Sequence, residues 1–378
     1  MRIAIVVTHL LGTGHLVRAM TLARAFAHKG HAVHVISGGT PLANLDRGKV
    51  ALHQLTPVKS DGVNFTILLG VDGQPIGQEA LAQRSKMACN LIRKIAPDVL
   101  ICELYPFGRR VLKTEFLSIL QTARALDNQP VILCSIREIL APPSRPEKAL
   151  ETEAVLTRYF NAVLVHSDPL HTPLETSWPV TPPVAKLLAY TGYVAPPLPA
   201  PHPEGYGQGE VLVTAGGGDV GMGLFQTAVI AAQHDKHRHW RLLVGGASAA
   251  KNIARLQSLS NGHKITIEKT RPDFRQMLPN AAAAVAMCGY NTAMDLLQSG
   301  TPAVFVPFDA GGEQEQTLRA KSLSKAPQFA CISSSDLTPK KLLTALDQVK
   351  RNPSRSLQQF NGAEESVRIA VQLAKDRK

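Results

Sequence analysis

The stretch RIAIVVTHLLGTGHLVRAM, residues 2–20, is the part of the sequence that decides the fold class. Residues 2–8 form a short apolar run, which breaks at Gly12-Thr13-Gly14-His15 before apolar residues recur at helical spacing from Leu16. An apolar strand, a glycine turn and a helix make up the first part of a βα unit. Such units build parallel sheets that helices cover on both faces, so the stretch predicts an α/β protein.

The same alternation of apolar runs and helical stretches continues along all 378 residues, a length that predicts two domains. The predicted strands are residues 2–8, 31–37, 98–102, 130–135 and 161–167, and then 210–214, 240–244, 264–268, 283–287, 302–306 and 329–333. Between the two sets, a proline cluster excludes a helix interior or a central strand. We therefore expect two doubly wound domains, 1–195 and 210–354, a proline-rich linker, 196–209, and a closing helix over 355–378.

The chain carries a formal net charge of +12, spread evenly over its length. Residues 1–195 hold 20 basic and 14 acidic side chains, and residues 196–378 hold 21 and 15, so neither half is a dedicated basic arm. Such a surface permits anionic partners, including phosphorylated sugars and an acidic membrane. Because aromatic residues make up only 5% of the chain, few side chains are available to stack on nucleic-acid bases. The composition therefore argues against a nucleic-acid partner.

Cysteine usage and hydropathy point to the cytoplasm. The five cysteines are odd in number, form no CxxC pair and lie partly in predicted strands, which favours reduced, buried thiols. The first apolar run is too short for a signal peptide, and no run approaches the ~20 residues that span a bilayer. Residues 340–378 hold nine basic and four acidic side chains. This favours a solvated helix face over contact with an anionic membrane surface, and leaves the second reading open.

Two glycine-rich loops are candidate anion sites, because open α/β sheets bind ligands outside the carboxyl ends of their strands. One is the GTGH turn at 12–15, and the other is AGGGDVGMG at 215–223. The second contains a literal GxGxxG, Gly216 to Gly221, but the following strand ends in LLVGG without the acidic residue that would hold a ribose. A nicotinamide or flavin enzyme is therefore disfavoured, and no P-loop motif is present.

The stretch CGYNTAMDLLQSGTPAVFVPFDAGGEQEQTLRA, residues 288–320, carries the most specific pattern. Residues 289–292 separate a predicted strand from a helix, which offers a helix N-terminus to a phosphate. Thr292 and Asp295 have the spacing of a capping box, with Gly300 as the C-cap. Asp295 could alternatively accept the ribose hydroxyls of a nucleotide; spacing alone favours the cap. Residues 311–316 read either as a solvated helix start or as a further part of the site.

These motifs resemble the GT-B glycosyltransferases related to family 28, the enzymes similar to the N-acetylglucosaminyltransferase that completes lipid II. The residues that carry the resemblance are GTGH, the glycine loop at 216–221, and GYNTAMDLLQSGTPAVFVPF followed by EQEQTLRA. HLLGTGHLVRA, CELYPFGRR and TGYVAP are similar to an uncharacterised bacterial group described as predicted glycosyltransferases. The resemblance implies a GT-B fold, in which two Rossmann-like domains with doubly wound parallel sheets face each other across a cleft.

The resemblance also implies roles for individual residues in donor binding. Asp295 falls where the family has a ribose-binding glutamate. Arg271 falls where the main chain of the family's enzymes recognises uracil. The other implied contacts to the nucleotide sugar come from the glycine loops and from two helix starts: Gly12, Gly14, Gly216, Gly217, Gly218, Gly289, Asn291, Thr292, Glu315 and Gln316. The closing helix is expected to cross back onto the first domain.

His15 is the candidate general base on the acceptor hydroxyl, because the resemblance places this histidine in the cleft. The positive end of a helix keeps an imidazole neutral and able to accept a proton. The alternative is a histidine that only caps or packs the turn. Glu103, at the end of a strand, either orients His15, binds the acceptor, or is a helix N-terminal carboxylate. Arg109 and Arg110 either meet an acceptor phosphate or face water, and we expect water.

The function implied is inverting transfer of a sugar from a nucleoside-diphosphate sugar, with UDP favoured, to an acceptor hydroxyl. No obligatory metal cofactor is expected, because neither glycine loop shows metal-ligand spacing. A lipid-linked or cell-envelope glycan acceptor agrees with the resemblance, and the chain is expected in the cytoplasm, either free or peripheral at the inner face of the membrane. Two alternatives remain open: a UDP-sugar hydrolase or epimerase on the same fold, and a non-catalytic nucleotide-sugar-binding subunit.

Overall fold

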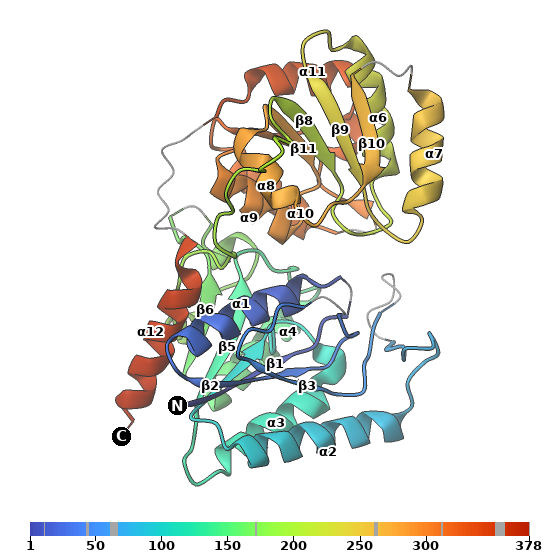
Figure 1. Ribbon diagram of the computed structural model, residues 1–378. Coiled ribbons are helices and arrows are strands. Elements are labelled where there is room, and N and C mark those ends of the chain that lie inside the picture. Colours follow the sequence, from blue (N-terminus) through green and yellow to red (C-terminus); the bar gives the residue numbers. More distant parts are fainter. Residues whose placement is uncertain are drawn as a thin grey trace. The chain divides into compact units, whose positions relative to one another are not determined.

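The computed structural model describes residues 1–10, 12–42, 45–60, 67–170, 172–260, 264–310, 313–351 and 360–377 (Figure 1). The chain divides into two compact units. Unit 1 consists of Met1–Ala195 together with Gln358–Lys378, and unit 2 consists of Pro196–Leu357. Each unit is an α/β layer structure built on one parallel sheet.

Within the described part of unit 1, seven parallel strands have the order β3-β2-β1-β4-β5-β6-β7. Their bounds are β1 Arg2–Val7, β2 Ala32–Ser37, β3 Ala51–Gln54, β4 Val99–Glu103, β5 Val131–Arg137, β6 Ala162–His166 and β7 Leu188–Tyr190. The five strands predicted for this half are confirmed. The sequence reasoning missed β3 and β7, because these short edge strands are only partly buried and so carry no continuous apolar run.

Helices cover both faces of the unit 1 sheet. They are α1 Gly14–His28, α2 Gln78–Ile95, α3 Lys113–Arg124, α4 Pro146–Tyr159, α5 Pro182–Ala185 and α12 Gly362–Lys375, with short 3-10 turns at Arg110–Leu112 and Leu174–Thr176. The final helix, α12, packs beside α1 (Figure 1). The segment 352–359, which includes the predicted start of the closing helix, lies outside the described residues.

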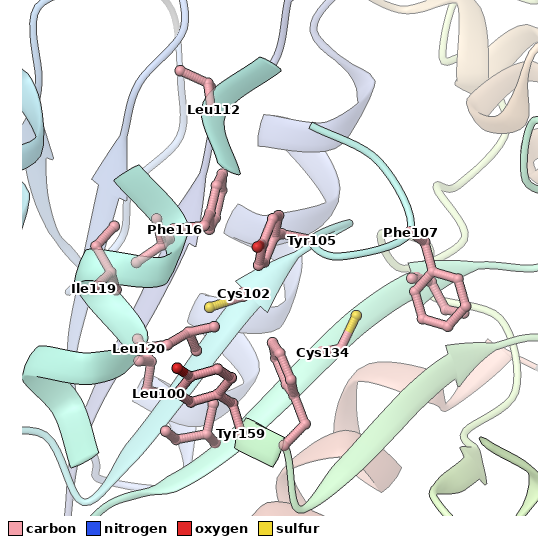
Figure 2. Close-up of a cluster of buried hydrophobic side chains, with 14 of the residues drawn as sticks. Leu100, Cys102, Tyr105, Phe107, Leu112, Phe116, Ile119, Leu120, Cys134 and Tyr159 are labelled. Atoms are coloured by element: carbon pink, nitrogen blue, oxygen red, sulfur yellow. The ribbon is translucent and has the colours of Figure 1, made fainter. Parts of the chain in front are cut away.

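Alternation along the strands produces two separate cores in unit 1, because successive side chains of a strand point to opposite faces. Ala4 and Val6 of β1 join a core with α2 and α3, whereas Ile3, Ile5 and Val7 join a core with α1 and α12. Figure 2 shows the first core, in which aromatic rings surround two cysteines of the sheet.

The cysteines are free thiols, and all of them lie in described segments. Cys89, Cys102, Cys134 and Cys288 are buried, and Cys331 is half-buried. Burial raises the pKa of the Cys102 and Cys134 thiols well above the ordinary range, so both remain protonated.

Within the described part of unit 2, six parallel strands have the order β10-β9-β8-β11-β12-β13. Their bounds are β8 Glu210–Thr214, β9 His239–Val244, β10 Ile265–Lys269, β11 Ala283–Ala286, β12 Ala303–Phe305 and β13 Phe329–Cys331, and all six were predicted. The helices are α6 Met222–His234, α7 Ala249–Leu259, α8 Phe274–Met277, α9 Tyr290–Ser299, α10 Glu315–Leu323 and α11 Pro339–Gln348, with 3-10 turns at Leu278–Asn280 and Ser334–Asp336.

The proline-rich segment 196–209 is part of unit 2 and forms hydrogen bonds with the rest of that unit. The His202 N–H donates to the Gln276 carbonyl at 3.0 Å, and the Gly209 N–H donates to the Asn280 carbonyl at 3.0 Å. The ring of Tyr206 lies 4.4 Å from the guanidinium carbon of Arg271. The segment therefore supports the loop that begins at Arg271.

The strand orders place the candidate loops at one point in each sheet. In unit 1 the order of strands reverses between β1 and β4, and in unit 2 it reverses between β8 and β11. In open α/β sheets, ligands bind at the carboxyl edge beside this reversal, where the loops diverge to the two faces. The GTGH turn and Glu103 lie there in unit 1. The glycine loop after β8 and the residues after β11 lie there in unit 2.

Candidate active site

In unit 1, His15 and Glu103 are in direct contact. His15 is the second residue of α1, Glu103 is the last residue of β4, and His15 Nδ1 lies 2.9 Å from Glu103 Oε1. The two side chains are 11% and 2% exposed. An ionised carboxylate can only accept hydrogen bonds, so Nδ1 carries the proton of the neutral ring. The lone pair is therefore on Nε2, the nitrogen that a general base would use.

The surroundings keep His15 neutral and Glu103 ionised at neutral pH. Burial lowers the pKa of His15 to about 3; the hydrogen bond to Glu103 opposes this shift, and Arg109 and Arg137 add to it. Burial by itself would raise the pKa of the Glu103 carboxyl, but the Arg18 guanidinium and the hydrogen bond from His15 outweigh it. The pKa of Glu103 therefore falls to about 2. The imidazole is neutral and the carboxylate is ionised.

A buried network that sequence reasoning missed extends from Glu103 into unit 1. Arg18 donates to Glu103 Oε1, and the Ser135 hydroxyl donates to Oε2 at 2.7 Å. Ser135 Oγ also lies 2.9 Å from His166 Nε2, and His166 Nδ1 lies 2.9 Å from Thr191 Oγ1. Because the Ser135 proton goes to Glu103, the hydroxyl oxygen accepts from His166 Nε2. The carboxylate is thus held on both oxygens.

Two features of the sequence could have indicated this network. Arg18 follows His15 by three residues, so both side chains lie on the same face of α1. Ser135 and His166 are polar residues in β5 and β6, two apolar strands that the sequence had identified. Only the order of the strands shows that β5 lies beside β4 and that β6 lies beside β5.

The expectation that Arg109 and Arg110 face water is wrong. Arg109 is half-buried and its Nε donates to the carbonyl of Thr8. The guanidinium of Arg110, also half-buried, packs over the ring of Trp178 at 5.6 Å. Leu104 and Arg109 both have left-handed backbone, with φ of 67° and 61°, a conformation that is uncommon for residues other than glycine.

In unit 2, the glycine loop after β8 has a backbone that two of its glycines make possible. Gly216 and Gly221 have φ of +80° and +87°, a region that favours glycine. Asp219 between them anchors the loop, because its carboxylate accepts from the Ala247 N–H at 2.9 Å and the Ser248 N–H at 2.7 Å. The loop is therefore tied to the start of α7. Sequence reasoning had not singled out Asp219.

Gly217 and Gly289, by contrast, are not required by the fold. Their backbone lies outside the left-handed region, and among the described atoms a Cβ at either position would meet nothing within 4 Å. Gly218 is similar, since a Cβ there would make only an ordinary contact with Val220 at 3.7 Å. Glycine at such positions is explained when another molecule approaches the backbone closely.

The capping box predicted at Thr292 and Asp295 is wrong. Helix α9 begins one turn earlier, with Gly289 as its N-cap and no side-chain cap, so Thr292 lies inside the first turn. Gly300 does end the helix, with φ of 65°. Asp295 is 13% exposed, and its Oδ1 accepts from Arg275 Nε at 2.7 Å. Burial raises the pKa of Asp295, and Arg275 opposes this.

The remaining residues implied in donor binding lie around α9 and α10. Asn291 and Thr292 are in the first turn of α9, and Asn291 is exposed. The Arg271 side chain is engaged with Asp273, with Nη2 and Oδ2 2.6 Å apart. Glu315 opens α10, and Gln316 Oε1 accepts from the Phe308 N–H at 3.2 Å. Gly311 and Gly312 lie outside the described residues.

Arg319 is a further residue that sequence reasoning missed. It is buried, donates from Nη1 to the Cys288 carbonyl at 2.9 Å, and lies over the ring of Tyr290. It therefore supports the turn between β11 and α9.

The described segments contain neither a metal-binding cluster nor a membrane-spanning helix. These residues contain no group of three or more His, Cys, Asp or Glu side chains that could hold a metal ion. No helix among them combines the length and the apolar character needed to cross a lipid bilayer.

Comparison with known proteins gives the class of enzyme. Residues 213–376 match the model of the glycosyltransferase family 28 C-terminal domain. The chain is a glycosyltransferase with the GT-B fold, and its C-terminal part is similar to family 28. This glycosyltransferase is 25% identical, over 94% of its own length and 88% of the relative's, to the UDP-N-acetylglucosamine--N-acetylmuramyl-(pentapeptide) pyrophosphoryl-undecaprenol N-acetylglucosamine transferase of Rhodospirillum rubrum.

Solved structures show the same fold for this glycosyltransferase. The glycotransferase of kitacinnamycin superimposes with a TM-score of 0.64 at 15% identity, over 99% of this chain and 98% of that one. The MurG protein of Acinetobacter baumannii superimposes with a TM-score of 0.62 at 16% identity, over 99% of each chain. The predicted α/β architecture of two doubly wound domains in a GT-B fold is confirmed.

Proposed function

We propose that this glycosyltransferase moves a sugar from UDP-sugar to an acceptor hydroxyl with inversion, and that His15 is the general base. The observation that carries the proposal is the hydrogen bond between His15 Nδ1 and Glu103. It supports a tautomer whose Nε2 can accept a proton, in a ring that is neutral near pH 7. Glu103 orients the ring and stabilises the imidazolium that forms during the reaction.

In the proposed reaction, the acceptor oxygen attacks the anomeric carbon of the donor while its proton passes to His15 Nε2. The bond between that carbon and the diphosphate oxygen breaks, and its electron pair leaves with UDP. Attack opposite the leaving group inverts the anomeric centre. Negative charge grows on the diphosphate, and N–H groups of a glycine loop and a helix N-terminus stabilise such charge.

We propose that unit 2 supplies most of the donor contacts. Gly216, Gly217 and Gly218, together with Gly289 and the first turn of α9, would receive the diphosphate. The open space beside Gly217 and Gly289 supports this role. Asp295 would accept from the ribose and the main chain at Arg271 would contact uracil. Glu315 and Gln316 would bind the sugar, and Gly12 and Gly14 would complete the donor site. No obligatory metal is part of the proposal.

The acceptor we propose is a lipid-linked or cell-envelope glycan precursor. The printed name of the Rhodospirillum rubrum relative, which describes a pyrophosphoryl-undecaprenol acceptor, supports this class. The net charge of +12 would favour peripheral contact with anionic lipid at the cytoplasmic face of the membrane, and we propose no nucleic-acid partner.

Transfer assays test the proposal. The purified protein is incubated with a panel of radiolabelled UDP-sugars and dTDP-sugars and with extracts of envelope lipids and glycans, with and without EDTA. We expect label in the lipid or glycan fraction from a UDP-sugar, retained in EDTA, with an inverted anomeric centre by NMR. Label in free sugar would instead indicate hydrolysis, and an epimerised donor would indicate an epimerase. UDP binding without turnover, unchanged by His15→Ala, would indicate a non-catalytic subunit.

A further inference from the structure

Arg275 connects Asp295 with the first residues of unit 2. Its Nε donates to Asp295 Oδ1 at 2.7 Å. Its Nη2 lies within hydrogen-bond distance of three other oxygens: the carbonyls of Pro196 and Pro197, each at 3.1 Å, and Gln298 Oε1 at 2.9 Å. Gln298 Nε2 also donates to the Pro196 carbonyl at 3.1 Å. The guanidinium is therefore held by neutral acceptors from two other parts of the chain.

Only one of the two carboxylate oxygens of Asp295 accepts a hydrogen bond from Arg275. Asp295 Oδ1 accepts from Arg275, whereas the structure records no hydrogen bond to Oδ2 within the segments it describes. A bidentate arginine would occupy both oxygens, and here the second edge of the guanidinium is turned to backbone carbonyls instead. An ionised carboxylate with one oxygen fixed and one oxygen open can accept from a sugar hydroxyl.

We propose that Arg275 is a positioning residue for donor binding, which fixes Asp295 through Oδ1 and leaves Oδ2 to accept from the ribose hydroxyls of the nucleotide. The inference rests on the proposed ribose contact of Asp295. Aspartate is shorter than the glutamate that the family resemblance implies at this position. The carboxylate of Asp295 therefore depends more on a neighbouring side chain, that of Arg275, to orient it toward the ribose. The proline-rich start of unit 2 takes part, because its carbonyls hold the guanidinium.

The affinities for two nucleotides distinguish a positioning role of Arg275 from a general structural role. UDP and 2′,3′-dideoxy-UDP share the base and the diphosphate, and only UDP offers hydroxyls to Asp295. For the wild type, we expect calorimetry to give about tenfold or more tighter binding of UDP, the usual size of a hydrogen bond to a charged group. In Arg275→Gln this preference should fall to about twofold or less, while binding of the dideoxy nucleotide changes much less.

Arg238→Gln is a matched control. Arg238 is 23% exposed, compared with 27% for Arg275, and is paired with Asp235 at 2.6 Å in the same unit. This variant should keep the wild-type preference for UDP. Arg275→Lys keeps a charge but cannot bridge the same four oxygens, so its preference should be intermediate. It also provides the measurement if Arg275→Gln does not fold.

The outcomes distinguish this inference from the proposed function. A wild type that does not bind UDP, or binds both nucleotides equally, overturns the donor role of Asp295. A wild type that prefers UDP, with Arg275→Gln and Arg275→Lys retaining that preference in full, overturns only the role of Arg275. An equal loss of affinity for both nucleotides in the variants also overturns it, because the arginine would then support the unit as a whole.

Discussion

Replacing His166 with glutamine should make the stability of unit 1 less sensitive to acid. His166 is fully buried, and burial lowers its pKa to about 3, with Arg18 adding to the shift and Glu103 opposing it. In the unfolded chain a histidine has a pKa of about 6.5. Below that pH the unfolded state takes up a proton that the folded state excludes, so stability falls as the pH falls from about 6.5 toward the folded pKa.

The size of the effect follows from these two pKa values. Between pH 7 and pH 5, exclusion of one proton by His166 removes about 2 kcal/mol from the free energy of unfolding. Burial is the main reason that the folded state does not take the proton, and Arg18 adds to it because it already supplies a positive charge beside Glu103. In His166→Gln, the loss of stability between pH 7 and pH 5 should therefore be about 2 kcal/mol smaller than in the wild type.

Urea unfolding at the two pH values measures this difference. The chain has two tryptophans, Trp178 in unit 1 and Trp240 in unit 2, and both are buried. In a Trp240→Phe background, fluorescence reports on unit 1 through Trp178. Thr191→Val is the control, because it removes a hydrogen bond to His166 but keeps the histidine. The same acid sensitivity in His166→Gln and in its parent would refute the reasoning.

The remaining predictions concern the two halves of the candidate site. His15→Asn should lower the rate of sugar transfer about 100-fold or more while UDP affinity stays unchanged, as single-turnover kinetics and calorimetry can show; an unchanged rate would exclude His15 as the base. Glu103→Gln leaves the buried guanidinium of Arg18 without this carboxylate and should cost about 3–5 kcal/mol in urea unfolding; a cost below about 1 kcal/mol would contradict the ion pair. Gly217→Ala and Gly289→Ala should stay within about 1 kcal/mol of wild-type stability and yet weaken UDP binding; alanine variants that bind UDP normally would argue against the phosphate role.

The strands that are buried on both faces of a sheet could be predicted from the sequence. The eleven predicted strands are all present, because each is a run of apolar residues between turn residues. β3 and β7 escaped detection because edge strands are covered less and need no such run. The capping box at Thr292 is wrong for a different reason: helix α9 begins at Tyr290 after its N-cap Gly289, so Thr292 and Asp295 both lie inside the helix.

The site was readable only in part. The GTGH turn and the strand end at Glu103 directed attention to two of the groups now found in contact. Arg18, Ser135 and His166 were not found, because a buried polar residue in an apolar stretch looks like an exception until its partner is known. Arg275 was also not found, because nothing in its local sequence points to Asp295, twenty residues away.

The sequence by itself determined the class of the fold and the positions of the loops that carry chemistry, because apolar periodicity and glycine turns act over a few residues. Tertiary structure alone decided which loops meet. The reversal of strand order between β1 and β4 brings His15 to Glu103 across 88 residues, and the neighbouring strands supply the partners of that carboxylate. Local patterns cannot specify such pairs, because they depend on how the strands pack side by side in the sheet.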